Sequence, residues 1–496
     1  MENNLPFIPD GLPAGSQLYA RAYNTHYEII NYKMGDCKKI EADLSIWDPV
    51  YYKRIEYYYY DKKHKVLYIP RGYDANIVAE QTGRPINFME NHRPKKRFHF
   101  SVGTPPRDAY QREMIRYLTG KEEYKKMFFE SQQVLSLPTR SGKTYCTITA
   151  VSILESKALV IVNSDTLREQ WASEILSHTQ LSESNIKIVK SSKFFDPVSK
   201  DRKKRFKDTY IYIVTHRTIH NAIKLHGMQI VNDALRDLDI GIKIIDEAHI
   251  EFRNTLMTDY ATNVWKTFYL TATFARSDAQ ENLIFQKSFN QVMKIAKKNP
   301  EREKTVKLFM VSFRTKPTDA EVQSICFKKM GFSRYAYINY EFTKGKLDEV
   351  VTSILKIVIE QKQLEGRILI LSSKIESCDH FKQLAEELFP AYTVCSHHSD
   401  NKVEDFREYG IICATPSMLG TGTTIPGLRI VLNTEPTSSA VNTVQIFGRL
   451  DIYAPGMDTY YFMIMDTGFV KIKKMFNRIK NILKYQAKEI IDFDYS

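Results

Sequence analysis

The stretch QQVLSLPTRSGKTYCTITAVSIL, residues 132 to 154, joins an apolar run to a helical pattern through a short polar loop. The run before the loop has the composition of a buried β-strand, and a helical segment follows the loop. Such a loop can bind phosphate, because backbone N–H groups and the positive end of the helix point at the same place. The stretch therefore predicts an α/β domain with a phosphate site where the strand ends.

Within this loop, LPTRSGKT, individual residues have predicted roles. The Lys143 ammonium would reach the β and γ phosphates of a nucleotide, and the Thr144 hydroxyl would be a ligand of Mg²⁺. The other predicted contacts with ATP in the loop are Pro138, Thr139, Arg140, Ser141 and Gly142. Leu137 stands where the strict pattern has glycine, so the loop alone leaves ATP binding open.

A second motif, IIDEAH at residues 244 to 249, places two carboxylates at the end of another apolar run. Asp246 could hold the Mg²⁺ of a bound nucleotide, and Glu247 could orient or deprotonate the attacking water. The alternative is a helix N-terminus with acidic residues, which is a common use of carboxylates. The upstream GKT, on what we predict is the same sheet, favours the nucleotide site.

Composition sets broad limits on the protein. The 496 residues predict two to four domains, with 43% hydrophobic and 26% charged residues, as in ordinary globular proteins. A net charge of +13 makes nucleic acid a natural partner, although a solvated basic surface is the plainer explanation. The six scattered cysteines predict reduced thiols rather than a disulfide framework or a zinc site. We expect neither a membrane span nor a signal peptide.

Short β-rich runs alternate with helical segments from residue 134 onward, which is typical of parallel sheets covered by helices on both faces. A charged stretch at residues 277–346 separates two groups of runs, and we expect it to be partly helix and partly linker. The predicted fold is α/β, with two domains in tandem at residues 101–285 and 286–496. The tyrosine-rich residues 1–100 predict a small β-containing accessory domain with a hairpin near residues 61–65, whose tyrosines either pack a sheet or stack on bases. From its position and charge, we expect this domain to bind DNA.

From residue 105 to its end the chain resembles the superfamily 2 helicases, and most of all the phage branch-migration helicases of the UvsW type and the XPB-like translocases. PRDAYQREMI resembles the segment in which a glutamine, here Gln111, recognises adenine. LPTRSGKT and IIDEAH resemble the first and second motifs of the family, and LTATFAR, residues 270 to 276, resembles the third. The resemblance implies two RecA-like domains with the nucleotide in the cleft between them and DNA across both.

The same resemblance assigns further residues. His249, Thr271 and Thr273 would couple the nucleotide to the nucleic acid, and CATPSMLGTGTTIPGL, which resembles motif five, contains Gly422 as an ATP contact. In QIFGRLDIY, which resembles motif six, Gln445 and Arg449 would be catalytic together with Lys143 and Glu247. Ile452 stands where a second arginine is expected, so Arg449, or else Arg140, would have to stabilise the γ-phosphate alone.

The nucleic-acid contacts implied by the resemblance lie in both domains. They are mainly small hydroxyls and backbone amides, which suit phosphate contacts that a motor must release at each step. They are Asn163, Ser164, Arg168, Thr215, His216, Ser372, Ser373 and Thr415.

The resemblance implies an ATP-dependent DNA helicase or translocase that needs ATP and Mg²⁺. It would act as a monomer on single-stranded, duplex or branched DNA, in replication, recombination or repair, in the cytoplasm of a host cell if phage-encoded. The alternatives are an RNA helicase, a nuclease-associated translocase subunit, and a nucleic-acid-binding protein whose ATP site is regulatory or inactive.

Overall fold

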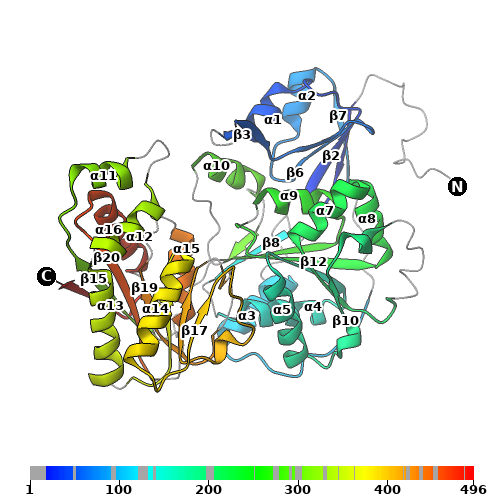
Figure 1. Cartoon of the computed structure of the whole chain (residues 1–496). Helices are drawn as coiled ribbons and strands as arrows, with labels where there is room; N and C mark the ends of the chain where they lie inside the picture. The colour runs from blue at the N-terminus through cyan, green and yellow to red at the C-terminus, as the bar shows by residue number, and fades with distance from the viewer. Residues whose placement is uncertain are drawn as a thin grey trace. The chain divides into compact units, whose positions relative to one another are not determined.

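The computed structural model describes residues 18–48, 52–90, 97–120, 132–137, 141–196, 206–250, 252–271, 279–289, 293–295, 304–327, 332–344, 346–361, 364–416, 418–419, 425–434, 440–450, 456–484 and 486–495. The chain divides into two compact units, residues 1–298 and 299–496. Each unit contains a seven-stranded parallel sheet with helices on both faces, and the first also carries the N-terminal β-structure (Figure 1).

The parallel sheet of the first unit has the order β10-β11-β9-β12-β13-β8-β14. Its strands are β8 (Gln132–Ser136), β9 (Lys157–Val162), β10 (Ile186–Val189), β11 (Ile211–Thr215), β12 (Ile240–Asp246), β13 (Lys266–Thr271) and β14 (Met293–Ile295). The four strands β9, β11, β12 and β13 are buried almost throughout, which explains why their sequences read as continuous apolar runs.

Alternate side chains of these strands enter two different cores. One core lies under α3 (Ala109–Thr119), α4 (Lys143–Ile153) and α5 (Asp165–His178). The other lies under α7 (His216–His226), α8 (Met228–Asp237), α9 (Phe252–Tyr260) and α10 (Ala279–Ser288). The second core also contains side chains of the N-terminal region, so that region and the parallel sheet share one apolar interior.

The N-terminal region forms a five-stranded sheet of order β5-β6-β2-β1-β7. Its elements are β1 (Leu18–Ala22), β2 (His26–Ile30), β5 (Tyr59–Asp61), β6 (Val66–Pro70), β7 (Ile86–Glu90), α1 (Lys38–Asp43) and α2 (Asn76–Thr82). A separate two-stranded hairpin consists of β3 (Ser45–Asp48) and β4 (Lys53–Glu56). The hairpin predicted near residues 61–65 is confirmed, because β5 and β6 pair antiparallel.

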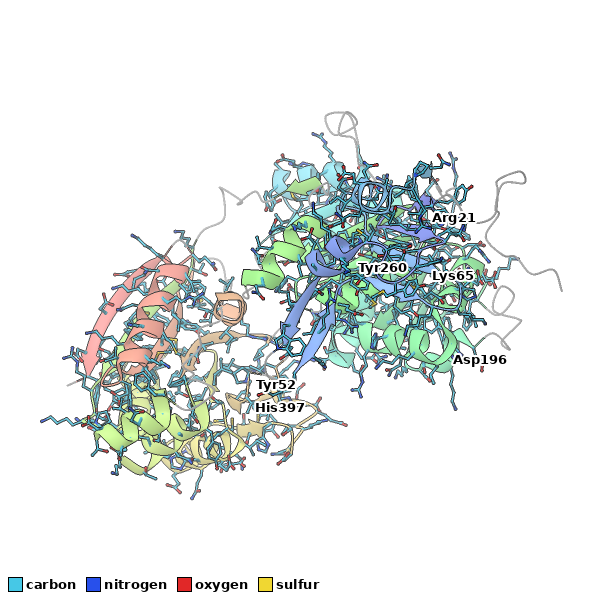
Figure 2. The ribbon with its side chains drawn as sticks, turned by 90° about the horizontal axis from the view of Figure 1, so that it is seen from above. Arg21, Tyr52, Lys65, Asp196, Tyr260 and His397 are labelled. Atoms are coloured by element: carbon cyan, nitrogen blue, oxygen red, sulfur yellow. The ribbon has the colours of Figure 1, made fainter. Side chains whose placement is uncertain are left out.

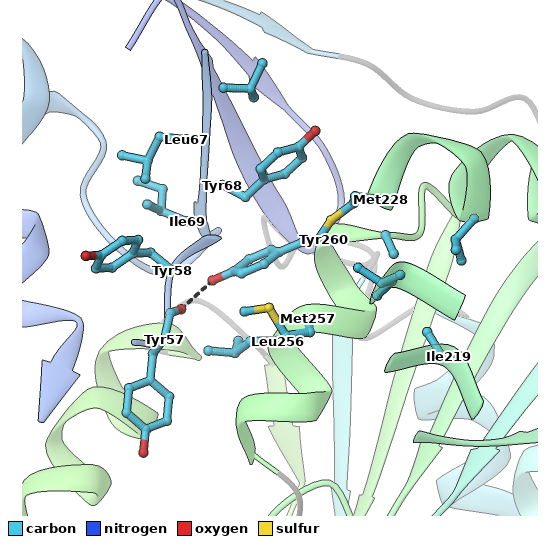
Figure 3. Close-up of a cluster of buried hydrophobic side chains, with 14 of the residues drawn as sticks. Tyr57, Tyr58, Leu67, Tyr68, Ile69, Ile219, Met228, Leu256, Met257 and Tyr260 are labelled. Atoms are coloured by element: carbon cyan, nitrogen blue, oxygen red, sulfur yellow. Dashed lines mark hydrogen bonds between the residues drawn. The ribbon is translucent and has the colours of Figure 1, made fainter. Parts of the chain in front are cut away.

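Tyrosines of the N-terminal region pack this shared core. Tyr57, Tyr58, Tyr68 and Tyr73 are all buried, which favours the packing explanation for them over base stacking. The Tyr260 hydroxyl on α9 donates to the Tyr57 carbonyl at 2.7 Å, as Figure 3 shows.

A buried ion pair lies beside this contact. The Lys243 ammonium, in the middle of β12, is 2.5 Å from both the Asp259 carboxylate and the Thr262 hydroxyl. The Tyr269 hydroxyl donates to the other Asp259 oxygen at 2.9 Å, and the Thr25 hydroxyl of the N-terminal region donates to the Asp259 carbonyl at 3.1 Å. Burial lowers the pKa of Lys243 and raises that of Asp259, and each partner opposes the shift of the other.

The second unit repeats the architecture with a sheet of order β17-β18-β16-β19-β20-β15-β21. Its strands are β15 (Val306–Phe313), β16 (Arg367–Leu371), β17 (Val394–His397), β18 (Ile411–Ala414), β19 (Leu428–Asn433), β20 (Thr459–Asp466) and β21 (Glu489–Tyr495). One core lies under α11 (Asp319–Cys326), α12 (Arg334–Lys344), α15 (Ala440–Phe447) and α16 (Val470–Leu483). The opposite core lies under α13 (Leu347–Lys356) and α14 (Ile375–Leu388).

Two sequence predictions of organisation need correction. We expected the second domain to begin at residue 286, but β14 pairs with β8 in the first sheet and the units divide after Lys298. We also expected residues 277–346 to be helix and linker, but β15 lies inside the second sheet between β20 and β21. The strand was missed because Lys307 lies within it and interrupts its apolar residues.

All six cysteines are free and buried, as expected for reduced thiols. The described part of the chain contains no cluster of three or more histidine, cysteine or acidic residues that could hold a metal ion. Within the same residues, no helix has the length and apolar character needed to cross a bilayer.

We expect Lys243→Met to destabilise the first unit by about 3–5 kcal/mol, because it leaves the Asp259 carboxylate buried without its cation. Adding Asp259→Asn should recover part of the loss, since the amide oxygen can still accept from Tyr269. Urea unfolding measures the effect. Arg236→Met is the control: the pair of Arg236 with Asp233 is largely exposed, so its loss should change stability by less than about 1 kcal/mol. Equal effects of Lys243→Met and Arg236→Met would contradict a structural role for the buried pair.

A second expectation concerns pH. Burial beside the Asp466 carboxylate raises the pKa of Glu341, on α12, from its ordinary 4.5 to about 9. Between pH 4.5 and about 9, the Glu341 carboxyl is ionised in the unfolded chain but protonated in the folded one. The contribution of Glu341 to the free energy of unfolding therefore falls as pH rises through this range. Glu341→Gln should therefore stabilise the protein by about 3 kcal/mol at pH 7 and by little near pH 4.5. Denaturation at several pH values tests this, with exposed Glu387→Gln as control; parallel profiles of parent and Glu341→Gln would refute it.

Candidate active site

The loops that follow β8, β12 and β13 meet at one edge of the first sheet. All three strands are parallel and lie in the order β12-β13-β8, so their carboxyl ends point the same way. The Leu137 N–H donates to the Thr271 carbonyl at 3.0 Å, and the Ala248 N–H donates to the Leu270 carbonyl at 3.1 Å. These bonds bring three of the predicted motifs together, as the sequence reasoning required.

The predicted phosphate loop joins β8 to α4. Gly142 precedes the helix with φ of +82°, a conformation that favours glycine, and Lys143 is the first residue of α4. The Lys143 ammonium donates to the Leu137 carbonyl at 2.9 Å. The Leu137 side chain is fully buried in the core under α4, which explains the apolar residue at that position. The predicted contacts Pro138, Thr139 and Arg140 lie outside the described residues, whereas Ser141 is described and buried.

Gln111 lies against this loop. It sits in the first turn of α3, where its carboxamide oxygen accepts from the Arg107 N–H at 2.8 Å. A β-carbon added at Gly142 would lie 2.3 Å from the Gln111 amide nitrogen, so that approach also requires glycine. The adenine contact of Gln111 stays a prediction, but its proximity to the loop agrees with it.

The carboxylates of the second motif are held differently from one another. Burial raises the pKa of Asp246, while the Trp171 indole N–H, which donates to its Oδ2 at 2.9 Å, and the Lys143 ammonium both favour the charged form. Glu247 is buried and has φ of +50°, an uncommon conformation for a residue other than glycine. Such local strain is frequent at functional sites.

Two of the residues predicted to couple the nucleotide to the nucleic acid are in contact. His249 Nδ1 lies 2.7 Å from the Thr271 hydroxyl and 3.4 Å from Glu247 Oε2. His249 and Thr271 are both buried, so the second and third motifs form one hydrogen-bonded unit. Thr273 lies outside the described residues.

Asp246 and Thr144 fit the predicted Mg²⁺ site in their chemistry. A carboxylate and a hydroxyl are hard oxygen donors of the kind that Mg²⁺ prefers. A cation would also favour the ionised form of Asp246, whose burial otherwise disfavours it. The site residues therefore suit a nucleotide bound with Mg²⁺.

Trp171 is a site residue that the sequence reasoning missed. It lies on α5 and is buried, one turn after Arg168 and one before Ile175. That spacing predicts a core residue, and only the fold shows that its indole N–H reaches the carboxyl end of β12. Trp171 thus connects Asp246 to the helix whose N-terminus was predicted to contact nucleic acid.

The predicted nucleic-acid contacts of the first unit lie at the ends of β9 and β11. Ser164 and Thr215 cap α5 and α7, with their hydroxyls accepting from the N–H groups of Leu167 at 3.3 Å and Thr218 at 3.2 Å. In the described part of the chain, neither polar atom of the buried Asn163 carboxamide has a hydrogen-bond partner. These positions agree with the predicted contacts, which stay predictions.

Two further residues of this group have buried side chains, and their contacts with nucleic acid stay predictions. The Arg168 guanidinium is buried, donates to the Val189 carbonyl at 2.9 Å and pairs with Asp165 at 2.7 Å. Burial lowers the pKa of His216 to about 3, with help from the Lys243 charge, so the imidazole is neutral at physiological pH. In this conformation neither side chain offers a positive charge to a phosphate, and both serve the interior.

The second unit holds the remaining predicted residues. Ser372 and Thr415 are buried directly after β16 and β18, which are neighbours, and the buried Ser373 hydroxyl has no hydrogen-bond partner among the described residues. Gln445 lies on α15, and Arg449 is buried in the turn η6 (Gly448–Leu450) that follows it. Gly422 and Ile452 lie outside the described residues, so the roles of Arg449 and Arg140 at the γ-phosphate stay predictions.

Two family models match the sequence. The type III restriction enzyme res subunit matches residues 105–276, and the helicase conserved C-terminal domain matches residues 346–451. A segment of 119 residues is 28% identical to the general transcription and DNA repair factor IIH helicase/translocase subunit XPB of Encephalitozoon cuniculi. That segment spans 24% of this chain and only 16% of the relative.

The fold is similar to two solved structures of Mss116. One is Mss116p, with its NTE and C-tail deleted, bound to ssRNA and AMP-PNP, and the other is the DEAD-box helicase Mss116 bound to ssRNA and UDP-BeF. Both have a TM-score of 0.52 and 14% sequence identity, and they cover 79% of this chain and 75% or 76% of the other. At this identity the likeness concerns the fold alone, and with the family models it confirms two RecA-like domains.

Trp171→Phe should weaken nucleotide-dependent activity on the order of tenfold, because a hydrogen bond to a charged group contributes about 1.5–3 kcal/mol. The substitution should also raise the pKa of Asp246. The loss of activity should therefore grow as pH falls, and the acid limb of the activity profile should move to higher pH. Measuring nucleotide hydrolysis against pH tests this. Trp265→Phe, at a half-buried tryptophan elsewhere in the unit, is the control. If the acid limb of the Trp171→Phe profile lies at the same pH as that of the parent, the indole has a packing role alone.

Proposed function

We propose that this chain, a member of superfamily 2 of the helicases and translocases, is a motor that hydrolyses ATP to move along DNA. The observation that carries the proposal is the meeting of Lys143, Asp246 and Glu247 at one sheet edge, with His249 and Thr271 bonded behind them. Such an arrangement supplies a phosphate cation, a metal ligand and a base for water.

Lys143 acts as the phosphate ligand in this proposal. Its ammonium donates to the Leu137 carbonyl, so it is already directed by the loop that would surround the phosphates. Phosphate binding exchanges that neutral acceptor for a charged one, which makes a stronger hydrogen bond. The N-terminus of α4 adds further N–H donors at the same place.

Glu247 accepts a proton from, or orients, the attacking water. Burial and the nearby His249 hold its carboxylate in one place, which reduces the reorganisation needed during reaction. Mg²⁺, held by Thr144 and Asp246, would neutralise phosphate charge. The contact of His249 with Thr271 then links the nucleotide side to the third motif, through which a change at Glu247 can reach the nucleic acid.

DNA is the preferred track in this proposal, and single-stranded, duplex and branched forms are its candidate substrates. The support is the matched XPB segment, whose parent protein is named for transcription and DNA repair, together with the net charge of +13. RNA is the second candidate, because the structures of similar fold were solved with ssRNA. A role in replication, recombination or repair follows from the choice of DNA.

Lys143→Ala should lower nucleic-acid-stimulated ATP hydrolysis at least about a hundredfold, since it removes a preorganised charge at the phosphates. Glu247→Gln should lower hydrolysis by about 10² to 10⁴ while keeping ATP affinity, because the amide cannot accept a proton. Both variants should still bind nucleic acid. Turnover is measured with single-stranded DNA, blunt duplex, forked DNA and RNA.

Lys224→Ala and Glu174→Gln, on the surfaces of α7 and α5, are the matched controls. If RNA stimulates ATP hydrolysis more than any of the DNA substrates does, the track is RNA and not DNA. Absence of hydrolysis by the parent with every nucleic acid would instead favour a regulatory or inactive site, and full activity of Lys143→Ala would reject the phosphate-loop assignment.

A further inference from the structure

The β3–β4 hairpin of the N-terminal region has one face directed into the protein and one directed outward. Ile46 pairs with Ile55, and both pack against the shared apolar core. Trp47 pairs with Arg54 in the next register position, so these two side chains share the opposite face. Alternation along a half-buried strand predicts a polar residue at position 47, yet the largest apolar side chain stands there.

Two aromatic rings of this hairpin are exposed to solvent. The exposed fraction is 60% for Trp47 and 80% for Tyr52, in contrast to the buried tyrosines at positions 57, 58, 68 and 73. Tyr52 also has φ of +48°, which is rare for an aromatic residue. Figure 2 shows Tyr52 at the end of the hairpin, away from Tyr260 in the body of the first unit. The packing of the core therefore accounts for the other tyrosines but not for these two rings.

Exposed cations lie on the hairpin and on the helix that contacts it. Arg54 on β4, which shares the face of Trp47, and Lys38 and Lys39 on the adjacent α1 are exposed. Lys53 is also exposed, but it pairs across the hairpin with Asp48. The partners of the Arg54 guanidinium are the Ser45 hydroxyl, at 2.6 Å, and the Glu41 carbonyl, both of which are neutral.

Three further carboxylates near the hairpin accept hydrogen bonds within the protein. Glu41 accepts from the Gly35 N–H at 2.7 Å, Asp43 from the Tyr73 hydroxyl at 2.8 Å, and Glu56 from the Tyr58 hydroxyl at 3.1 Å. Half-buried and engaged in this way, they oppose the exposed cations less than free carboxylates would. The outer side of the hairpin thus combines flat apolar rings with cations.

We propose that this outer face binds single-stranded DNA, with unpaired bases stacked on Trp47 and Tyr52 and the backbone phosphates near Arg54. Aromatic rings stack with any base, whereas the bases of an intact duplex already stack on one another and leave no faces free. The inference rests on the proposed function, because it supplies that motor with a contact for the unpaired strand outside the RecA-like domains.

The chain offers a direct spectroscopic test. It contains three tryptophans, of which Trp171 is buried, Trp265 is half-buried and Trp47 is exposed. Adding oligo(dT) to the full-length protein without ATP should quench the fluorescence of Trp47, and the quenched component should be missing in Trp47→Phe. Blunt duplex should quench much less. Equal quenching in Trp47→Phe and the parent would overturn the proposal.

Affinity gives the second measurement. Trp47→Ala and Tyr52→Ala should each weaken oligo(dT) binding on the order of tenfold, with little change for blunt duplex. Phe327→Ala, at a ring of 59% exposure in the second unit, is the matched control. Because both hairpin rings are exposed, the variants should unfold at the parental denaturant concentration.

The outcomes separate this inference from the proposed function. If DNA still stimulates ATP hydrolysis in the parent while the double variant Trp47→Ala/Tyr52→Ala binds oligo(dT) normally, the hairpin proposal fails and the motor stands. Equal loss of duplex and oligo(dT) affinity also rejects base stacking. If no nucleic acid stimulates the parent, the motor proposal fails, and the quenching experiment still decides whether the hairpin binds unpaired bases.

Discussion

The parallel direction of the strands in the first sheet is the constraint on which the rest of this protein depends. Parallel strands place every carboxyl end at the same edge, so three loops far apart in sequence lie next to one another. The bonds from Leu137 to Thr271 and from Ala248 to Leu270 continue the ladder just beyond the strands. Without that shared edge, Lys143, Asp246 and Glu247 would be unrelated charged residues.

Strand β12 links the site to the N-terminal region. Its end carries Asp246, and its middle carries Lys243, whose ion pair with Asp259 lies beside the contacts of Thr25 and Tyr57 with α9 and its carboxyl end. The buried pair is costly to desolvate and tolerable only with its hydrogen bonds complete. The N-terminal region helps to enclose it and contributes side chains to the apolar core of the first sheet, so it belongs to the first unit. Any ligand held by the β3–β4 hairpin is therefore attached to the same body as the nucleotide site.

The helix α5 makes a comparable connection on the other side of β12. Ser164 caps its N-terminus near the predicted nucleic-acid contacts, and Trp171 donates to Asp246 from its second turn. A rigid helix that carries both contacts can transmit small displacements between them, provided that both stay bonded. The His249 contact with Thr271 offers a second connection of this kind. Together they give the proposed motor two physical links between ATP hydrolysis and nucleic-acid binding.

The sequence alone determined the elements whose signals are local. The phosphate loop, the two carboxylates, the apolar central strands and the Tyr59–Pro70 hairpin were all predictable, because short-range spacing and continuous burial leave a clear pattern. The tertiary structure decided what depends on distant partners. Strand β15 is placed by its pairing with β20 and β21. The burial of the Arg168 and His216 side chains, and the hydrogen bond from the Trp171 N–H to Asp246, likewise depend on residues far away in the sequence. The physical reason is that side-chain type and spacing set what a residue can do, whereas burial and the neighbours across the fold set which of those things it does.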